Sequence, residues 1–198
     1  MVVTLKDISN IVTGHVFRNK IAYSLEGNVN LLNMDAISKA GKANISNNDV
    51  KKVIARDLRE NEIIKAEDIL FKAKGLNNIS VLINTIPSNT TVTASCHIVR
   101  LTDNNYLPEY VCAMMNGIAA KKHFAKASGK ASGVTISNVS KQTLETLKIP
   151  KIPLSKQKII AGFIECAEKE HELSLKIADK KETLNRAIIK KELNRLGA

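Results

Sequence analysis

The chain has 198 residues, which is enough for one domain with its own hydrophobic core and an appendage, so its stability requires neither a disulfide nor a metal. Its formal charge of +11 and isoelectric point near 9.6 fit a polyanionic partner or a soluble protein that happens to be basic, and the clustering of lysines after Asn116 favours nucleic acid. Cys96, Cys112 and Cys166 are scattered and lack metal-binding spacing, which indicates a reduced cytoplasmic protein without a zinc site. The amino terminus has no signal-peptide pattern and no run of about eighteen apolar residues occurs, so we expect neither export nor a membrane partner.

The first half of the sequence predicts short strands separated by turns. Runs rich in β-forming residues recur between clusters of Gly, Asn, Asp and Ser. Turns are expected at residues 27–28, 41 and 75–78. The expected strands cover residues 29–34, 63–64, 68–73, 80–86 and 91–101.

Helices are predicted from Pro108 onward, because proline suits the first position of a helix and apolar residues then recur at helical spacing until residue 116. A second helix is expected over 119–126 and a third after Ser137 or Ser140, before a proline-flanked extended segment at 149–153. The sequence therefore predicts an α/β (α+β) domain over residues 1–153, with a mixed, largely antiparallel sheet and short helices.

Residues 154–198 are predicted to form one long helix. From residue 155 to 196 there is no proline, and a helix of that length extends for about 60 Å. Its apolar residues form a broad stripe flanked by alternating Lys and Glu, which one small domain cannot bury, so we expect a partner helix. The alternative is two shorter helices that fold back on the domain. The residues expected to dimerise are Ile160, Phe163, Ile164, Ala167, Leu173, Ile177, Leu184 and Ile188.

The segment from residue 116 to 151 is predicted to meet an anion, since its seven lysines (121, 122, 126, 130, 141, 148 and 151) face one glutamate, at 145. We expect its first four lysines to contact phosphates and its small residues to shape a loop that approaches a groove. Loops elsewhere supply further candidates, of which Arg18 and two asparagines have the chemistry to read base edges. The alternative for each lysine is a solvated surface charge. The candidates are Lys121, Lys122, Lys126 and Lys130; the loop residues Ser128, Gly129, Ser132 and Gly133; and Lys72, Lys74, Arg18, Lys20, His15, Asn77 and Asn78.

Motifs for chemistry are missing. The sequence contains neither GxGxxG nor GxxxxGK[ST], and it lacks the glycine loop and polar tetrad of an adenine or cytosine methyltransferase. Glu67 and Asp68, followed by lysines, leave a small metal-dependent nuclease as an alternative, although adjacent acids on a strand point to opposite sides. A free-standing dimeric nucleic-acid-binding regulator is the other alternative. We expect no catalytic residue, metal or cofactor in this chain.

Several short motifs occur in a characteristic order. They are LKDI from residue 5, Gly14, GNV from 27, MDAI from 34, ILFKAKG from 69, LPEYV from 107, SG from 128, LKIP from 147, PL from 153 and QKII from 157. With these motifs the chain resembles, over nearly its whole length, the specificity (S) subunit of type I restriction-modification systems, in a half-length form with a single target recognition domain. It departs from the family where Glu67 replaces a usual glycine and where residues 130–132 lengthen a Gly-Ser-Gly-like loop.

The resemblance implies a non-catalytic subunit that recognises double-stranded DNA. Two copies would pair their long helices antiparallel and read a bipartite palindromic site of two inverted half-sites. The resemblance also implies docking to methyltransferase (M) subunits, which carry S-adenosylmethionine, and to restriction (R) subunits.

Overall fold

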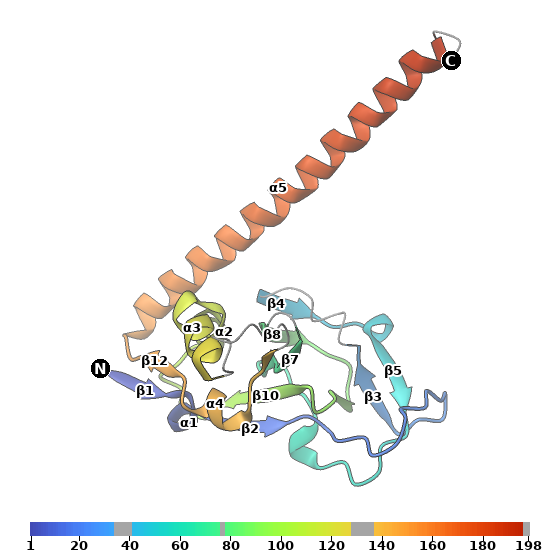
Figure 1. Ribbon diagram of the computed structural model, residues 1–198. Coiled ribbons are helices and arrows are strands. Elements are labelled where there is room, and N and C mark those ends of the chain that lie inside the picture. Colours follow the sequence, from blue (N-terminus) through green and yellow to red (C-terminus); the bar gives the residue numbers. More distant parts are fainter. Residues whose placement is uncertain (34–40, 76–77, 128–136, 196–198) are drawn as a thin grey trace. The chain divides into compact units, whose positions relative to one another are not determined.

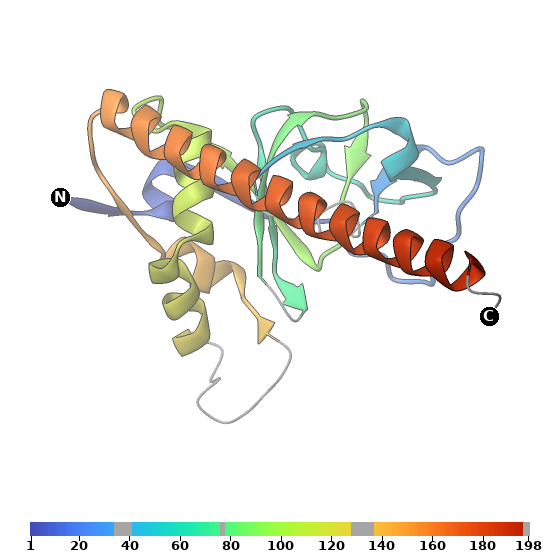
Figure 2. The same cartoon turned by 90° about the horizontal axis from the view of Figure 1, so that it is seen from above.

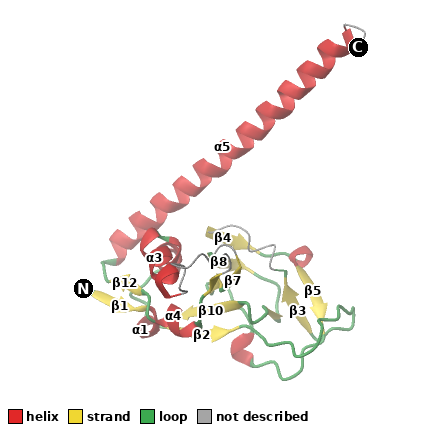
Figure 3. Ribbon diagram, in the orientation of Figure 1, coloured by secondary structure: helices red, strands yellow, loops and turns green. Residues whose placement is uncertain are grey.

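The computed structural model describes residues 1–33, 41–75, 78–127 and 137–195 (Figure 1). Contacts divide the chain into two compact units, residues 1–161 and 162–198. The first unit holds all the strands and short helices, and the second holds most of the long carboxy-terminal helix (Figure 3). The α+β class with a mixed, mostly antiparallel arrangement of strands is as the sequence predicts.

A five-stranded sheet in the order β2-β10-β6-β8-β4 forms the centre of the first unit. Neighbouring strands are antiparallel except β4, which runs parallel to β8. Val99 pairs with Ile11 on one side and with Ile69 on the other, so β10 is an interior strand. The strands are β2 (Ser9–Thr13), β4 (Gly41–Asn44), β6 (Ile69–Lys72), β8 (Ser80–Thr85) and β10 (Cys96–Leu101).

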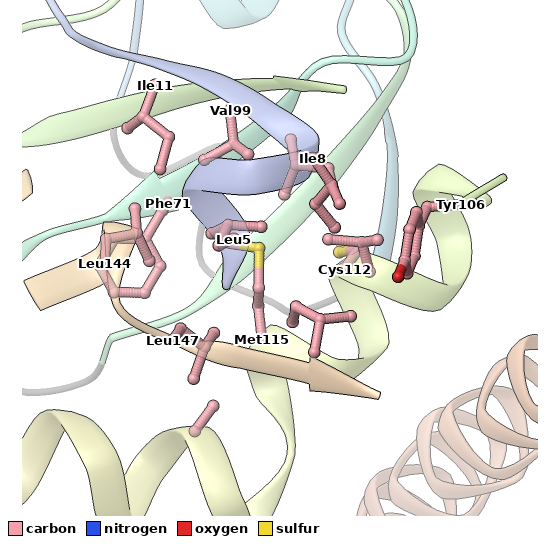
Figure 4. Packing of buried hydrophobic residues seen from close by; sticks show 14 of the residues in the cluster. Leu5, Ile8, Ile11, Phe71, Val99, Tyr106, Cys112, Met115, Leu144 and Leu147 are labelled. Carbon is pink, nitrogen blue, oxygen red and sulfur yellow. The ribbon is translucent and has the colours of Figure 1, made fainter. Parts of the chain in front are cut away.

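Both faces of this sheet are buried, because alternate residues along its strands enter two different cores. Ile69 and Phe71 enter one core, whereas Leu70 between them enters the other. Figure 4 shows how helical side chains such as Leu5 and Met115 close over the first face. This face is covered by α1 (Leu5–Ile8), α2 (Pro108–Asn116), α3 (Ile118–Ala127), α4 (Lys141–Glu145) and the antiparallel pair β1 (Val2–Thr4) and β12 (Lys148–Pro150).

A second, three-stranded sheet supplies residues to the other core. Its order is β5-β3-β9, with β3 antiparallel to β5 and parallel to β9. Leu32 of β3 packs with Leu70 and Ile98 of the five-stranded sheet. The remaining elements are β3 (Val29–Leu32), β5 (Val50–Val53), β9 (Thr90–Thr91), β7 (Lys74–Gly75), β11 (Ser137–Asn138) and the 3-10 turns η2 (Asn47–Asp49) and η3 (Glu60–Glu62).

The long helix α5 (Leu154–Arg195) is continuous over 42 residues, about 63 Å, as predicted and not as two shorter helices. It begins at the predicted boundary, but its first turns belong to the first unit. Gln157 is fully buried there, and Ile160 packs against the core. Within the described residues no helix is both long and apolar enough to cross a membrane.

The structure corrects two expected strands and one expected turn. The run 91–101 is divided into β9 and β10 by a turn in which the N–H of Cys96 donates to Thr93 and that of Ala94 donates to His15. Residues 63–64 form no strand, since they follow the turn η3. Gly41 begins β4 instead of a turn, and the last residue expected in strand 29–34 lies outside the described part.

Candidate nucleic-acid interface

The helix α3 presents three of the predicted lysines on a firmly held scaffold. Phe124 is 3% exposed, and its ring centroid lies 5.0 Å from that of Phe71 on the central sheet. The Nε2 atom of His123 lies 2.9 Å from the carbonyl oxygen of Thr143 in α4. The outward side chains Lys121, Lys122 and Lys126 are exposed, and no ion pair joins them to a described carboxylate. Their charge therefore faces solvent and is open to an external anion.

The short strand β11, which follows α3 in the chain, pairs with β7. Lys74 pairs with Asn138 and Gly75 with Ser137, and the φ of Gly75 is 133°, a value that glycine accommodates without strain. Lys74 is exposed and Lys72 is half-buried. The segment between α3 and β11 contains the predicted loop residues Ser128, Gly129, Lys130, Ser132 and Gly133, which lie outside the described residues.

Of the two asparagines predicted to read bases, the structure describes only Asn78. Asn77 lies outside the described residues. The side-chain amide of Asn78 donates to the carbonyl oxygens of Lys72 at 3.0 Å and Ala73 at 3.1 Å. These bonds give Asn78 a role in holding the turn between β6 and β8.

A second basic surface forms where the segment after β2 meets β5. Arg18 and Lys20 are exposed on this segment, which Tyr23 fastens to β5 by a bridge to Val53. Tyr23 is 62% exposed, and the Nζ of Lys51 lies 4.8 Å from its ring centroid. Lysine and tyrosine side chains both donate to DNA phosphates. Figures 1 and 2 place this surface and α3 toward opposite ends of the first unit.

Sequence reasoning missed Tyr23, Lys51 and Lys52 of this surface. The signal for the lysines is their place between two valines in VKKV, a short β-forming run in which they are exposed. The residues next to Tyr23 in the sequence do not predict its place on this surface, since the strand that it pairs with lies nearly thirty residues away.

His15 was expected among the DNA contacts, and the structure places it inside the fold. It is 7% exposed, and its Nδ1 lies 2.8 Å from Oε2 of Glu62, whose other carboxylate oxygen, Oε1, accepts from Nε of Arg59 at 2.8 Å. Burial by itself raises the pKa of Glu62, but the hydrogen bonds to His15 and Arg59 lower it by more than burial raises it. The pKa of Glu62 therefore lies below its usual range. An ionised Glu62 thus holds the imidazole of His15 inside the fold.

Asp68, the key residue of the nuclease alternative, is 1% exposed and fully engaged. Its carboxylate accepts from Nε of Arg100 at 2.7 Å and Nη2 of Arg100 at 2.6 Å, and from the N–H of Lys65 at 2.8 Å. Its neighbour Glu67, which replaces a usual glycine of the family that the motifs resemble, has a φ of 69°, a conformation that favours glycine. In the described ranges no three His, Cys, Asp or Glu side chains gather as metal ligands. Asp68 therefore has a structural role, since it joins Arg100 to the backbone at Lys65.

Comparison with known proteins identifies the domain. The family model "Type I restriction modification DNA specificity domain" matches residues 1–186. The chain belongs to this family. The resemblance seen in the sequence motifs is thereby confirmed. No curated protein matches the chain in sequence.

Solved structures agree in fold. One, from work on complex assembly and conformational transition of the type I R-M system, has a TM-score of 0.63 at 14% identity and covers 94% of this chain. The HsdS subunit from Thermoanaerobacter tengcongensis has a TM-score of 0.56 at 12% identity and covers 86%. The match takes in 43% and 37% of those two chains, so this chain spans less than half of their length.

Proposed function

We propose that this chain selects the DNA sequence on which a type I restriction-modification complex acts. The exposed lysines of α3, on a domain of the DNA specificity family, carry this proposal. Phosphate contacts by Lys121, Lys122 and Lys126 fix the position of the domain on the duplex without choosing a sequence. The choice comes from side chains that reach base edges, for which the exposed Arg18 after β2 has suitable chemistry.

The chain works as a homodimer in this proposal. Two copies joined through α5 carry two identical recognition domains related by a two-fold axis, and such a pair reads two inverted half-sites with a fixed gap. The chain contributes no catalysis. Its M subunits bring S-adenosylmethionine and methylate adenine, and R subunits cleave unmethylated DNA.

The test is the salt dependence of DNA affinity for the full chain. Each phosphate contact contributes about 0.9 to the slope of log K against log salt concentration, so the triple variant K121A/K122A/K126A lowers the slope by about 2 to 3 units. The control removes three exposed lysines outside α3, which are Lys6 in α1, Lys148 in β12 and Lys151 directly after β12, as K6A/K148A/K151A, and leaves the slope unchanged. Equal slopes in the two variants contradict the assignment of α3. Magnesium-dependent cleavage by the purified chain alone supports the nuclease alternative instead.

A further inference from the structure

The second unit has an exposed row of apolar side chains. Leu173, Ile177, Leu184 and Ile188 are 50%, 54%, 59% and 51% exposed. Their spacings of four, seven and four residues keep them within an arc of about 60° on a helix that turns about 100° per residue. Glu170 and Lys191 lie three residues beyond either end of this row, in the same arc. We call these six residues the α5 row.

The α5 row is symmetric along the helix. Its residues form three pairs, each centred on the bond between Lys180 and Lys181: 173 with 188, 177 with 184, and 170 with 191. The first two pairs are apolar, and the third has a glutamate at one end and a lysine at the other. A second copy rotated by a two-fold axis at this bond lays Leu173 on Ile188 and Ile177 on Leu184. The same rotation brings Glu170 to Lys191, and each contact occurs twice. We infer that the two-fold axis of the homodimer crosses α5 between Lys180 and Lys181.

The charges on α5 favour this partner in this orientation. Residues 165–172 contain four glutamates and one lysine, a net charge of −3. Residues 189–196 contain Lys190, Lys191, Arg195 and Glu192, a net charge of +2. An axis at 180/181 superimposes one segment on the other, since 165 pairs with 196 and 172 with 189. A parallel, in-register pair instead sets −3 against −3, so electrostatic complementarity selects the antiparallel arrangement.

The lysines at the axis make the register specific. Lys180 and Lys181 flank the α5 row at its centre, about 20° outside its arc on either side, and two copies bring these like charges near one another. Charged residues beside the core of a helix pair influence register and orientation, because other alignments place them against apolar side chains. With this axis, residue 161 of one copy and residue 161 of the other are 39 residues apart along the helix, which separates the two domain junctions by about 58 Å.

Cysteine cross-linking in the full chain tests the position of the axis. Cys166 is exposed on α5, whereas Cys96 and Cys112 are buried, so C166S gives a background without an accessible thiol. In that background L173C/I188C forms a covalent dimer through 173–188 disulfides, identified by peptide mass. The single variants L173C and I188C remain uncross-linked, because each cysteine faces an aliphatic residue of the other copy. A disulfide requires Cβ atoms about 3.5 to 4.5 Å apart, so a shifted register does not form it.

The inference rests on the proposed homodimer, and the outcomes separate the two. Light scattering of the C166S parent gives the mass of a dimer or a monomer, and a monomer overturns the homodimer itself. If the parent is a dimer, cross-linking of L173C alone shows either a parallel pair or an axis at residue 173, and both overturn the inference. Self-cross-linking of I177C alone moves the axis to residue 177 and also overturns it. If the L173C/I188C variant is a dimer but forms no disulfide under oxidising conditions, the inference is also overturned.

Discussion

Gln157 is expected to be the residue that fastens α5 to the recognition domain. Its side-chain oxygen accepts from the N–H of Leu107 at 2.9 Å, and its amide donates to the carbonyls of Asn105 at 2.8 Å and Ile152 at 2.9 Å. The side chain is fully buried, so these bonds satisfy groups that water does not reach freely. Leu107 is the N-cap of α2, and Gln157 therefore joins the first turn of α5 to the start of α2.

The substitution Gln157→Leu keeps the size of the side chain and removes all three bonds. Leu107 and Ile152 are half-buried, and a buried group left without its partner costs about 1 to 3 kcal/mol. Asn105 is exposed and its carbonyl turns to water, so we expect a total loss of about 2 to 4 kcal/mol in the free energy of unfolding.

Urea unfolding of the full chain measures this loss as a lower midpoint with an unchanged m-value. The neighbouring exposed residue supplies the control, since Lys158→Leu changes stability by less than about 0.5 kcal/mol. A loss below about 1 kcal/mol for Gln157→Leu refutes the reasoning, because it means that the three groups find other partners.

Three further predictions concern backbone geometry, helix pairing and pH. Gly14→Ala lowers the free energy of unfolding by about 2 to 3 kcal/mol, because the added Cβ would lie 2.4 Å from a backbone oxygen. Glu67→Gly leaves the free energy of unfolding unchanged or raises it by up to about 1 kcal/mol, because residue 67 has a φ of 69°. Urea midpoints that change in the opposite order contradict both expectations. Glu170→Lys or Lys191→Glu alone weakens the dimer about fivefold and the double reversal restores it, as measured by sedimentation equilibrium, whereas either single change strengthens a parallel pair because it lowers like-charge repulsion. Burial lowers the pKa of His97 in the folded chain, so as the pH falls below about 6.5 the unfolded chain binds a proton at this residue before the folded chain does. The free energy of unfolding therefore decreases as the pH falls from about 6.5 toward the lower pKa of the folded state. If His97→Gln loses stability equally steeply over this pH range, His97 is not the cause.

Sequence periodicity predicted the elements whose own residues determine them. The strands around Phe71 and Ile83 and the helix α5 follow from local patterns of apolar residues and the absence of proline. The break between β9 and β10 could not be predicted, because it depends on a hydrogen bond from Ala94 to His15, almost eighty residues earlier. Short strands such as β1 and β12 form by pairing with each other and carry little pattern of their own.

The same division applies to the candidate interface. The lysines of α3 were predictable because they cluster within one helix, where apolar Phe124 and Ala120 define the inward face. The burial of His15 was not predictable, since Glu62 holds it from a distant segment. The surface of Tyr23 and Lys51 likewise exists only because the fold brings two segments together.

Mapping methylated adenines in cells that carry this chain with an M subunit tests whether the chain chooses the DNA sequence. We expect methylation at one bipartite motif, made of two inverted copies of the same half-site with a constant gap, and we expect this methylation to disappear when the chain is deleted. An asymmetric motif contradicts the homodimer of identical recognition domains. Methylation that continues at the same sites without the chain contradicts its role in choosing the sequence.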